Sequence, residues 1–498
     1  MKLSLSLDNF RKFKHLDSLD CSEITFLVGP NGSGKSSFTK ALLLEISNFN
    51  RFASPDPQEE DGNSFPIFRF DSIKYGDMHI DRFSRALYNC ADNDQISLIL
   101  STHGKSGITN TYGMTIKKSS TNKDTAVISQ IDICSRIKGS VKFVIDYESA
   151  TYSIIFFDEN DNQLYEKKEQ RETRSALDVA FHVIGGVPEA IVNKVIGTSL
   201  IGGAAMAALA SIPFLGAVVG AGAALGLDFF SKKKETKQNK NTDDYLPYEI
   251  APALYALTQI QIDYVYAHYV EQNFLFGGKN HDYLSNTIVE FFSLGCMNHS
   301  GIMSFILKWM DNDHFKIGDG FDIRDSEFSN SYYFDIIENE QRIPLADKGV
   351  GQIQIMILLM RIGIANTIYD NRNISIRDFK VGVGSPLIII EEPEQNMHPN
   401  MQSKLADLFK DAHDRFGIRF LIETHSEYIV RRSQVLVSQL YKDRPEDFLT
   451  NNIFKVIYFP EDGQPYDMQF KQNGFFVRSF KPGFIDEAGK WQMELLTK

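Results

Sequence analysis

The spacing of apolar residues predicts different structures along this chain. Near the N-terminus, Lys2 to Leu7 alternates leucine with polar residues, as in a half-buried strand, and 24–28 is a mainly apolar run typical of a buried strand. A glycine-rich loop follows, and then apolar residues recur at helical spacing. These are Phe38, Leu42, Leu43 and Ile46. The pattern predicts a strand, a loop and a helix that packs on a sheet.

Between residues 97 and 157 the pattern changes to short β-rich runs separated by turn residues. The runs are 112–116, 126–133, 141–147 and 152–157. They predict an antiparallel β subdomain.

The C-terminal part alternates long apolar segments with short turns. It predicts a helix over 351–367, a buried strand over 386–390, a helix over 400–415 and a strand over 418–422. Such alternation favours an α/β layer with a largely parallel sheet.

The middle of the chain differs from both ends. Residues 195–227 carry no charge and are rich in glycine and alanine, and a polar, basic linker follows over 231–245. Three interpretations stay open for this segment: a packed helical hairpin, membrane contact, or a flexible segment. Helical periodicity resumes over 247–310, so we expect three regions, namely 1–160, a mainly helical insertion over 161–335, and 336–498.

Composition narrows the class of protein. The 498 residues include 43% hydrophobic side chains, enough for a large core, and the net charge of −12 does not indicate a general nucleic-acid binder. Four dispersed cysteines lack metal-ligand spacing, and the first residues lack the apolar run of a secretory signal. A cytoplasmic location is therefore expected.

The sequence GPNGSGKS at Gly29–Ser36 matches the phosphate-binding P-loop, in the strand–loop–helix context that this motif requires. Backbone N–H groups of such a loop surround a polyphosphate, Lys35 reaches the β and γ phosphates, and Ser36 ligates Mg²⁺. The predicted ATP-binding residues here are Gly29, Asn31, Gly32, Ser33, Gly34, Lys35, Ser36 and Ser37.

Two further strands end in polar residues. Glu391 and Glu392 follow the run 387–390, which makes Glu391 a metal-supporting carboxylate and Glu392 a candidate general base. His425 follows 420–422 and can donate a hydrogen bond to a γ-phosphate or to its attacking water. Lys35, Glu392 and His425 form the predicted catalytic set.

These motifs together resemble the ABC-type ATPase head of SMC- and RecF-like proteins. The segments that carry the resemblance are DNFRKF at 8–13, the P-loop, IIIEEPEQNMHP at 388–399 and ETHSEYIVRR at 423–432. The Glu-Glu-Pro-Glu run ending in His-Pro resembles the OLD-like (overcoming lysogenization defect) ATPases, here without a Toprim domain. The implied fold is an α/β ABC-type head with an antiparallel β subdomain and an inserted helical region.

The resemblance also implies partners and further site residues. The segment 346–352 takes the place of the family's signature, with Gly349 and Gly351 as nucleotide contacts and Lys348 as an anion partner. Phe10 and Arg11 fall where relatives contact the nucleotide. It implies a head-to-head homodimer or larger homo-oligomer that controls an effector, a nuclease or toxin, in anti-phage defence of the Septu, PARIS or Gabija kind.

Two alternatives remain open. One is a RecF- or SMC-like DNA-maintenance ATPase, and the other is a membrane-acting effector that uses 195–227.

Overall fold

The computed structural model describes residues 2–52, 60, 65–70, 80–103, 109–122, 124–136, 139–170, 261–266, 276–277, 282–326, 331–372, 385–442, 446–448, 452–481, 491 and 493–495. The predictions for the glycine- and alanine-rich segment 195–227 and for the linker 231–245 lie outside these residues.

The chain divides into two units that interleave in sequence. Unit 1 comprises Met1–Asp20, Ser37–Gln261 and Arg372–Gly384; unit 2 comprises Cys21–Ser36, Ile262–Asn371 and Ser385–Lys498. The expected regions 1–160, 161–335 and 336–498 instead followed chain order, because sequence patterns alone do not reveal which distant segments share a sheet.

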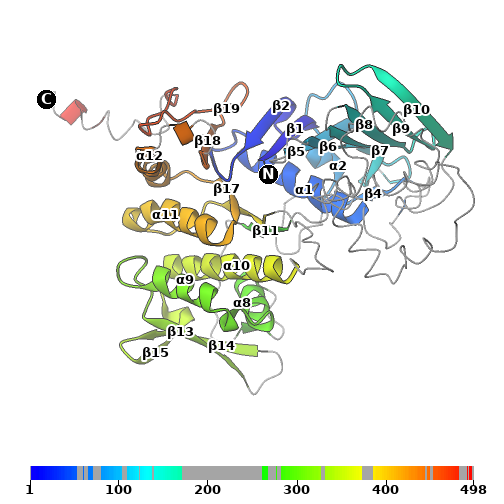
Figure 1. Cartoon of the computed structure of the whole chain (residues 1–498). Helices are drawn as coiled ribbons and strands as arrows, with labels where there is room; N and C mark the ends of the chain where they lie inside the picture. The colour runs from blue at the N-terminus through cyan, green and yellow to red at the C-terminus, as the bar shows by residue number, and fades with distance from the viewer. Residues whose placement is uncertain are drawn as a thin grey trace, which may run out of the picture. The chain divides into compact units, whose positions relative to one another are not determined.

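Unit 1 is built on a nine-stranded sheet with the order β10-β9-β8-β7-β6-β5-β1-β2, in which β4 also pairs with β7 (Figure 1). Its strands are β1 Lys2–Phe10, β2 Phe13–Cys21, β4 Ile67–Phe68, β5 Gln95–His103, β6 Thr109–Lys118, β7 Ala126–Arg136, β8 Ser140–Asp146, β9 Thr151–Phe157 and β10 Gln163–Gln170. The pairs from β5 to β10 are antiparallel. The antiparallel β subdomain predicted from the sequence is confirmed.

Helix α1, Lys35–Phe52, packs on this sheet as the apolar spacing predicts. Phe49 of α1 makes an edge contact with Tyr112 of β6, with ring centroids 5.8 Å apart. The short helix α2 spans Phe83–Ala86, and both of its end residues are buried.

Unit 2 contains the parallel sheet that the alternating C-terminal pattern predicted. The order is β11-β16-β17-β3-β18-β19. The strands are β11 Ile262–Val265, β16 Leu387–Glu391, β17 Arg419–Glu423, β3 Ile24–Val28, β18 Phe454–Tyr458 and β19 Tyr466–Asp467. The first five are parallel, and β19 runs antiparallel to β18. The α/β class is confirmed, and the N-terminal strand β3 lies between two C-terminal strands.

Helices and a small antiparallel sheet complete unit 2. The helices are α8 Tyr283–Ser293, α9 Ser300–Met310, α10 Val350–Arg372, α11 Pro399–Phe416 and α12 Glu427–Tyr441. Figure 1 shows them stacked from α12 through α11 to α10 and α9, with the small sheet beyond. That sheet consists of β12 Phe276–Gly277, β13 Gly320–Asp325, β14 Ser331–Glu338 and β15 Gln341–Pro344.

The structure describes only part of the expected insertion 161–335, so its mainly helical character stays a prediction. This described part holds α8, α9 and the 3₁₀ helix Cys296–Asn298, together with β10, β11, β12, β13 and the start of β14. Within the helical periodicity expected over 247–310 lies the strand β11, because a four-residue segment has too few positions to separate strand from helix.

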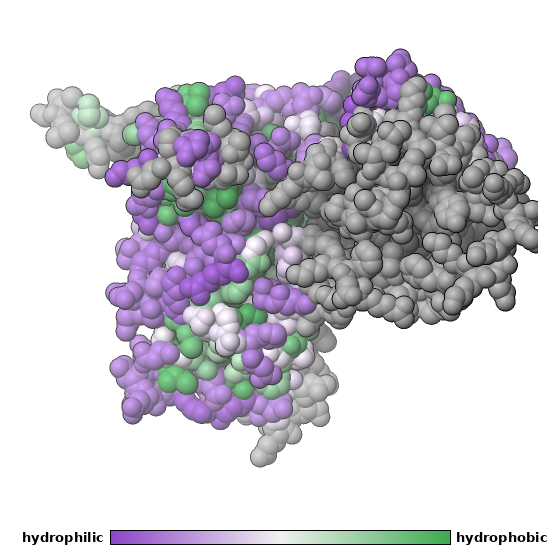
Figure 2. Space-filling model, in the orientation of Figure 1, coloured by the Kyte–Doolittle hydropathy of each residue, from purple (hydrophilic) through white to green (hydrophobic). Residues whose placement is uncertain are grey.

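Among the described helices, α10 has a segment, Val350–Asp370, that is long and apolar enough to cross a membrane, and 83% of its most apolar window is buried. Its apolar residues, Ile353 and Leu359 among them, belong to the core of unit 2. Figure 2 shows a largely hydrophilic face over the described residues in that view. We therefore interpret α10 as a core helix.

Candidate nucleotide and metal site

The loop between β3 and α1 has the backbone that a phosphate-binding loop needs. Gly29 and Gly34 adopt φ angles of 148° and 113°, which residues with a side chain rarely adopt. At Gly29 a Cβ atom would lie 2.2 Å from the carbonyl oxygen of Phe459, so the approach of these two backbones also requires glycine. This curvature leaves room for backbone N–H groups to face one anion.

Lys35 begins α1 and is almost completely buried, at 3% exposure. Its Nζ donates hydrogen bonds to the carbonyl oxygens of Gly29, at 2.9 Å, and Pro30, at 3.0 Å. Burial lowers the pKa of Lys35, and the nearby carboxylate of Glu423, whose Oε1 lies 4.0 Å from Nζ, partly offsets this effect. The lysine is thus held over the loop.

Ser36 and Glu423 join the P-loop to the end of β17. The Ser36 hydroxyl donates to Glu423 Oε1 at 2.8 Å. In the sheet, Glu423 pairs with Leu27 of β3 on one side and with Glu391 of β16 on the other. Burial, together with the charge of Glu391, raises the pKa of Glu423 to about 7. The sequence analysis assigned no role to Glu423, although its position after an apolar strand could have indicated one.

Glu391 ends β16 and is joined by a residue from β11 that the sequence analysis also missed. The buried Tyr264 interacts with the Glu391 carboxylate. Burial, and then the negative charge of Glu391, raise the pKa of Tyr264, so the phenol stays protonated. Glu391 Oε1 is buried and has no hydrogen-bond partner among the described residues.

Glu392 and His425 face each other across the two turns that follow β16 and β17. Glu392 has a left-handed backbone, with φ of 44°, and its N–H donates to the carbonyl oxygen of Glu423 at 2.7 Å. One carboxylate oxygen accepts from the Gln395 amide, and the other lies 3.6 Å from His425 Nε2. Burial, with the positive charge of Lys35, lowers the pKa of His425.

The side chains at this edge fit a divalent cation. One ligand atom each from Glu392, Glu423 and His425 lies within 4.8 Å of the others. Glu423 Oε2 and Glu391 Oε1 are buried without hydrogen-bond partners among the described residues, as expected of atoms that would face an ion. Because Mg²⁺ prefers oxygen ligands, the carboxylates and the Ser36 hydroxyl suit it better than the imidazole does.

The structure therefore brings most of the predicted site residues to one edge of the unit 2 sheet. Lys35, Ser36, Glu391, Glu392 and His425 all lie at the carboxyl ends of β3, β16 and β17 or in the segments that directly follow them. In the loop, Ser33 Oγ is buried without a partner among the described residues and Asn31 is exposed. Ser37 is buried. Phe10 and Arg11 belong to unit 1, where Phe10 is buried in the core.

The signature-like segment begins α10. Gly349 donates its N–H to Gln352 Oε1 at 3.3 Å, which caps the helix. Lys348, predicted as an anion partner, is paired with Glu338 at 2.6 Å. At Gly351 a Cβ atom would lie 2.7 Å from the carbonyl oxygen of Asn396, so this glycine lets α10 approach the turn after β16.

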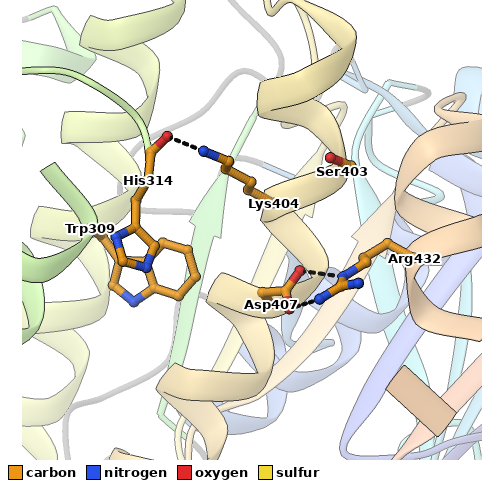
Figure 3. A pocket seen from close by; sticks show the side chains of 6 residues that line it. All are labelled: Trp309, His314, Ser403, Lys404, Asp407 and Arg432. Atoms are coloured by element: carbon orange, nitrogen blue, oxygen red, sulfur yellow. Dashed lines mark hydrogen bonds and ion pairs between the residues drawn. The ribbon is translucent and has the colours of Figure 1, made fainter. Parts of the chain in front are cut away.

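A separate surface cavity of about 330 Å³ lies between α9, α11 and α12 (Figure 3). It is lined by Trp309, His314, Ser403, Lys404, Asp407 and Arg432. Its charged groups bind each other or the backbone: Arg432 forms a two-pronged ion pair with Asp407, and Lys404 donates to the His314 carbonyl oxygen at 2.6 Å. These contacts connect α11 with α12 and with the segment after α9, and they leave few free groups for a ligand.

The arrangement of loop, lysine and strand-end carboxylates is that of a nucleotide-binding ATPase. Residues 1–430 match the AAA ATPase domain family, and the chain belongs to this family.

A curated relative, the hemin import ATP-binding protein HmuV of Aliivibrio fischeri, is 47% identical over 47 residues, which are 9% of this chain and 18% of that protein. The chain thus spans less than a fifth of that relative's length.

Two solved structures resemble the chain at low TM-scores. The SMC head domain from Thermotoga maritima has a TM-score of 0.33 and 10% identity, covering 94% of this chain and 100% of that chain. The Smc head domain bound to the C-terminal domain of ScpA, derived from Pyrococcus furiosus, has a TM-score of 0.36 and 12% identity, covering 100% of both chains.

Proposed function

We propose that this protein is an ABC-type ATPase of the P-loop kind that binds ATP with Mg²⁺ and hydrolyses it. The observation that supports this proposal is the convergence of Lys35, Ser36, Glu392, Glu423 and His425 on one edge of the unit 2 sheet. An ion-pair network that only stabilises the fold does not require a loop with glycines at positive φ beside it, whereas polyphosphate binding does.

Each residue has a defined task in this proposal. The Lys35 ammonium pairs with the β and γ phosphates, while Ser36, Glu391 and Glu423 would hold the metal. Bound Mg²⁺ supplies charge neutralisation on the phosphate oxygens. Glu392 accepts the proton of the attacking water at its carboxylate, and His425 donates a hydrogen bond from Nε2 toward the γ-phosphate.

Turnover of ATP by two variants tests the proposal. Lys35→Ala removes the phosphate partner and Glu392→Gln removes the base, and we expect each to lower kcat by about 100-fold or more. Glu427→Gln, on the exposed face of α12, is the matched carboxylate control and should keep wild-type turnover. Undiminished hydrolysis in both site variants would reject the assignment.

We further propose a head-to-head homodimer or larger ring in which 346–352 of one copy completes the site of another. The support is the signature-like position of Gly349 and Gly351 at the start of α10. The Glu392→Gln variant should bind ATP without turning it over, so its mass in solution should at least double when ATP is added. A monomer under both conditions would contradict this assembly.

The wider role that we propose is control of a separate effector, a nuclease or toxin, in cytoplasmic anti-phage defence. It predicts stable co-purification with the product of a neighbouring gene and ATPase-dependent protection against phage infection. ATP-stimulated, salt-dependent binding to duplex DNA would favour the DNA-maintenance alternative instead. Flotation with liposomes that is lost when 195–227 is deleted would favour the membrane-acting alternative.

A further inference from the structure

Glu394 is a buried carboxylate in the turn that follows β16, and it has no role in the chemistry described so far. It is 8% exposed. Burial raises its pKa. A buried carboxylate is costly unless hydrogen bonds compensate for the lost water, so the contacts of Glu394 indicate why the fold keeps it.

The carboxylate is directed to the turn after β17. Glu394 Oε1 accepts a hydrogen bond of 2.6 Å from the backbone N–H of His425, whereas Oε2 is buried without a hydrogen-bond partner among the described residues. The preceding residue, Thr424, donates its backbone N–H to the carbonyl oxygen of Leu27 in β3, at 3.0 Å. Glu394 therefore connects the turn that carries Glu392 to the turn that carries His425.

The spacing of the two reacting side chains depends on this connection. His425 Nε2 and Glu392 Oε1 are 3.6 Å apart, although they come from different strand ends. Displacement of a catalytic group by about 1 Å can reduce turnover about 100-fold. A hydrogen bond that fixes the His425 backbone therefore affects how accurately the imidazole is placed relative to the phosphate and the water.

We propose that Glu394 is a positioning residue that holds His425 in register with Glu392 for ATP hydrolysis. This inference rests on the proposed function of His425. It predicts that loss of the acceptor at Glu394 loosens the His425 backbone and slows the chemical step while leaving nucleotide binding largely intact.

The first test compares Glu394→Ala with Glu394→Gln, whose side-chain oxygen can still accept from the His425 N–H. Without nucleotide, amide hydrogen exchange in a peptide containing His425 should be faster in Glu394→Ala and close to wild type in Glu394→Gln. With ATP, kcat of Glu394→Ala should fall about 10-fold or more while KM changes by less than about threefold. Wild-type exchange and wild-type kcat in Glu394→Ala would overturn the inference.

A control and a second variant distinguish the positioning of His425 from a purely structural role of Glu394. Asp411→Asn removes a partly buried carboxylate that accepts from Lys308 and Trp309, and it should lower the unfolding temperature without lowering kcat. If Glu394→Ala does not fold, Glu394→Asp is the second variant. Its side chain is one methylene shorter, which moves the carboxylate away from the His425 N–H, so it should show the same loss of kcat. Glu394→Asp with wild-type exchange and kcat would overturn the inference.

The double variant separates this inference from the proposed function. If Glu394 acts through His425, Glu394→Ala combined with His425→Ala should be no slower than His425→Ala alone. Slow turnover in His425→Ala with full turnover in Glu394→Ala would overturn only this inference. Full turnover in His425→Ala would overturn the proposed role of His425 and this inference together.

Discussion

The hydroxyl of Ser36 donates a hydrogen bond of 2.8 Å to Oε1 of Glu423, a residue 387 positions later in the chain. The bond exists because β17 lies directly beside β3, so the ends of both strands meet at one edge of the sheet. Glu423 therefore belongs to the candidate metal site, together with Ser36 and Glu391.

Glu423→Gln tests this placement. The variant keeps the shape of the side chain but removes a negative charge that would face Mg²⁺, so we expect about a tenfold rise in the Mg²⁺ concentration for half-maximal ATP turnover. The measurement is an Mg²⁺ titration of ATPase activity, with Glu427→Gln as the control. An unchanged titration curve would place Glu423 outside the metal site.

Tyr264→Phe tests the support that β11 gives to Glu391. The change removes only the hydroxyl that interacts with the carboxylate, and a polar partner of a charged group contributes about 1.5–3 kcal/mol. We expect kcat to fall about tenfold with little change in the unfolding temperature, because the ring remains to fill the core. Steady-state kinetics and thermal unfolding of the same preparation give both quantities. Wild-type kcat would show that Glu391 does not need this hydroxyl.

Gly351→Ala tests the close approach of α10 to the turn after β16. A Cβ atom would lie 2.7 Å from the Asn396 carbonyl oxygen, which is backbone and has little freedom to move, so we expect a loss of about 1–3 kcal/mol in stability. The matched control is Gly301→Ala in α9, where no atom lies within 4 Å of the added Cβ. That control should leave the protein equally stable or slightly more stable, since alanine favours helices. Equal denaturation midpoints for the two variants would contradict the prediction.

Glu45 of α1 gives unit 1 a pH-dependent stability. Its carboxyl is completely buried, and burial raises its pKa well above the ordinary value of 4.5. The folded state therefore retains this proton more strongly than the unfolded state, so the group's contribution is fully present below pH 4.5 and is lost as the pH rises toward the folded pKa.

Glu45→Gln removes this titration while it keeps the size of the side chain. We expect the unfolding temperature of the variant to rise relative to wild type as the pH increases from about 5 to about 8. Thermal unfolding of both proteins across that range is the measurement. A difference that stays constant with pH would show that Glu45 does not titrate differently in the folded state.

The residue pattern determined the elements and the central motifs of this protein. The five-residue strands β3, β16 and β17 are mainly apolar, β16 and β17 end in glutamate, and glycine alone satisfies the φ angles of the loop at Gly29 and Gly34. Local chemistry of this kind depends on neighbours in sequence, so Lys35, Ser36, Glu391, Glu392 and His425 could all be predicted from it.

The tertiary structure alone decided which strands are neighbours, and with them the rest of the site. Tyr264 and Glu394 carry no motif of their own that names their partners, because their contacts with Glu391 and His425 arise only when β11 and β17 pair with β16. Within the helical periodicity expected over 247–310, residues Ile262–Val265 form the strand β11. Its pairing with Leu387–Ile390 stabilises a strand that four residues cannot specify alone.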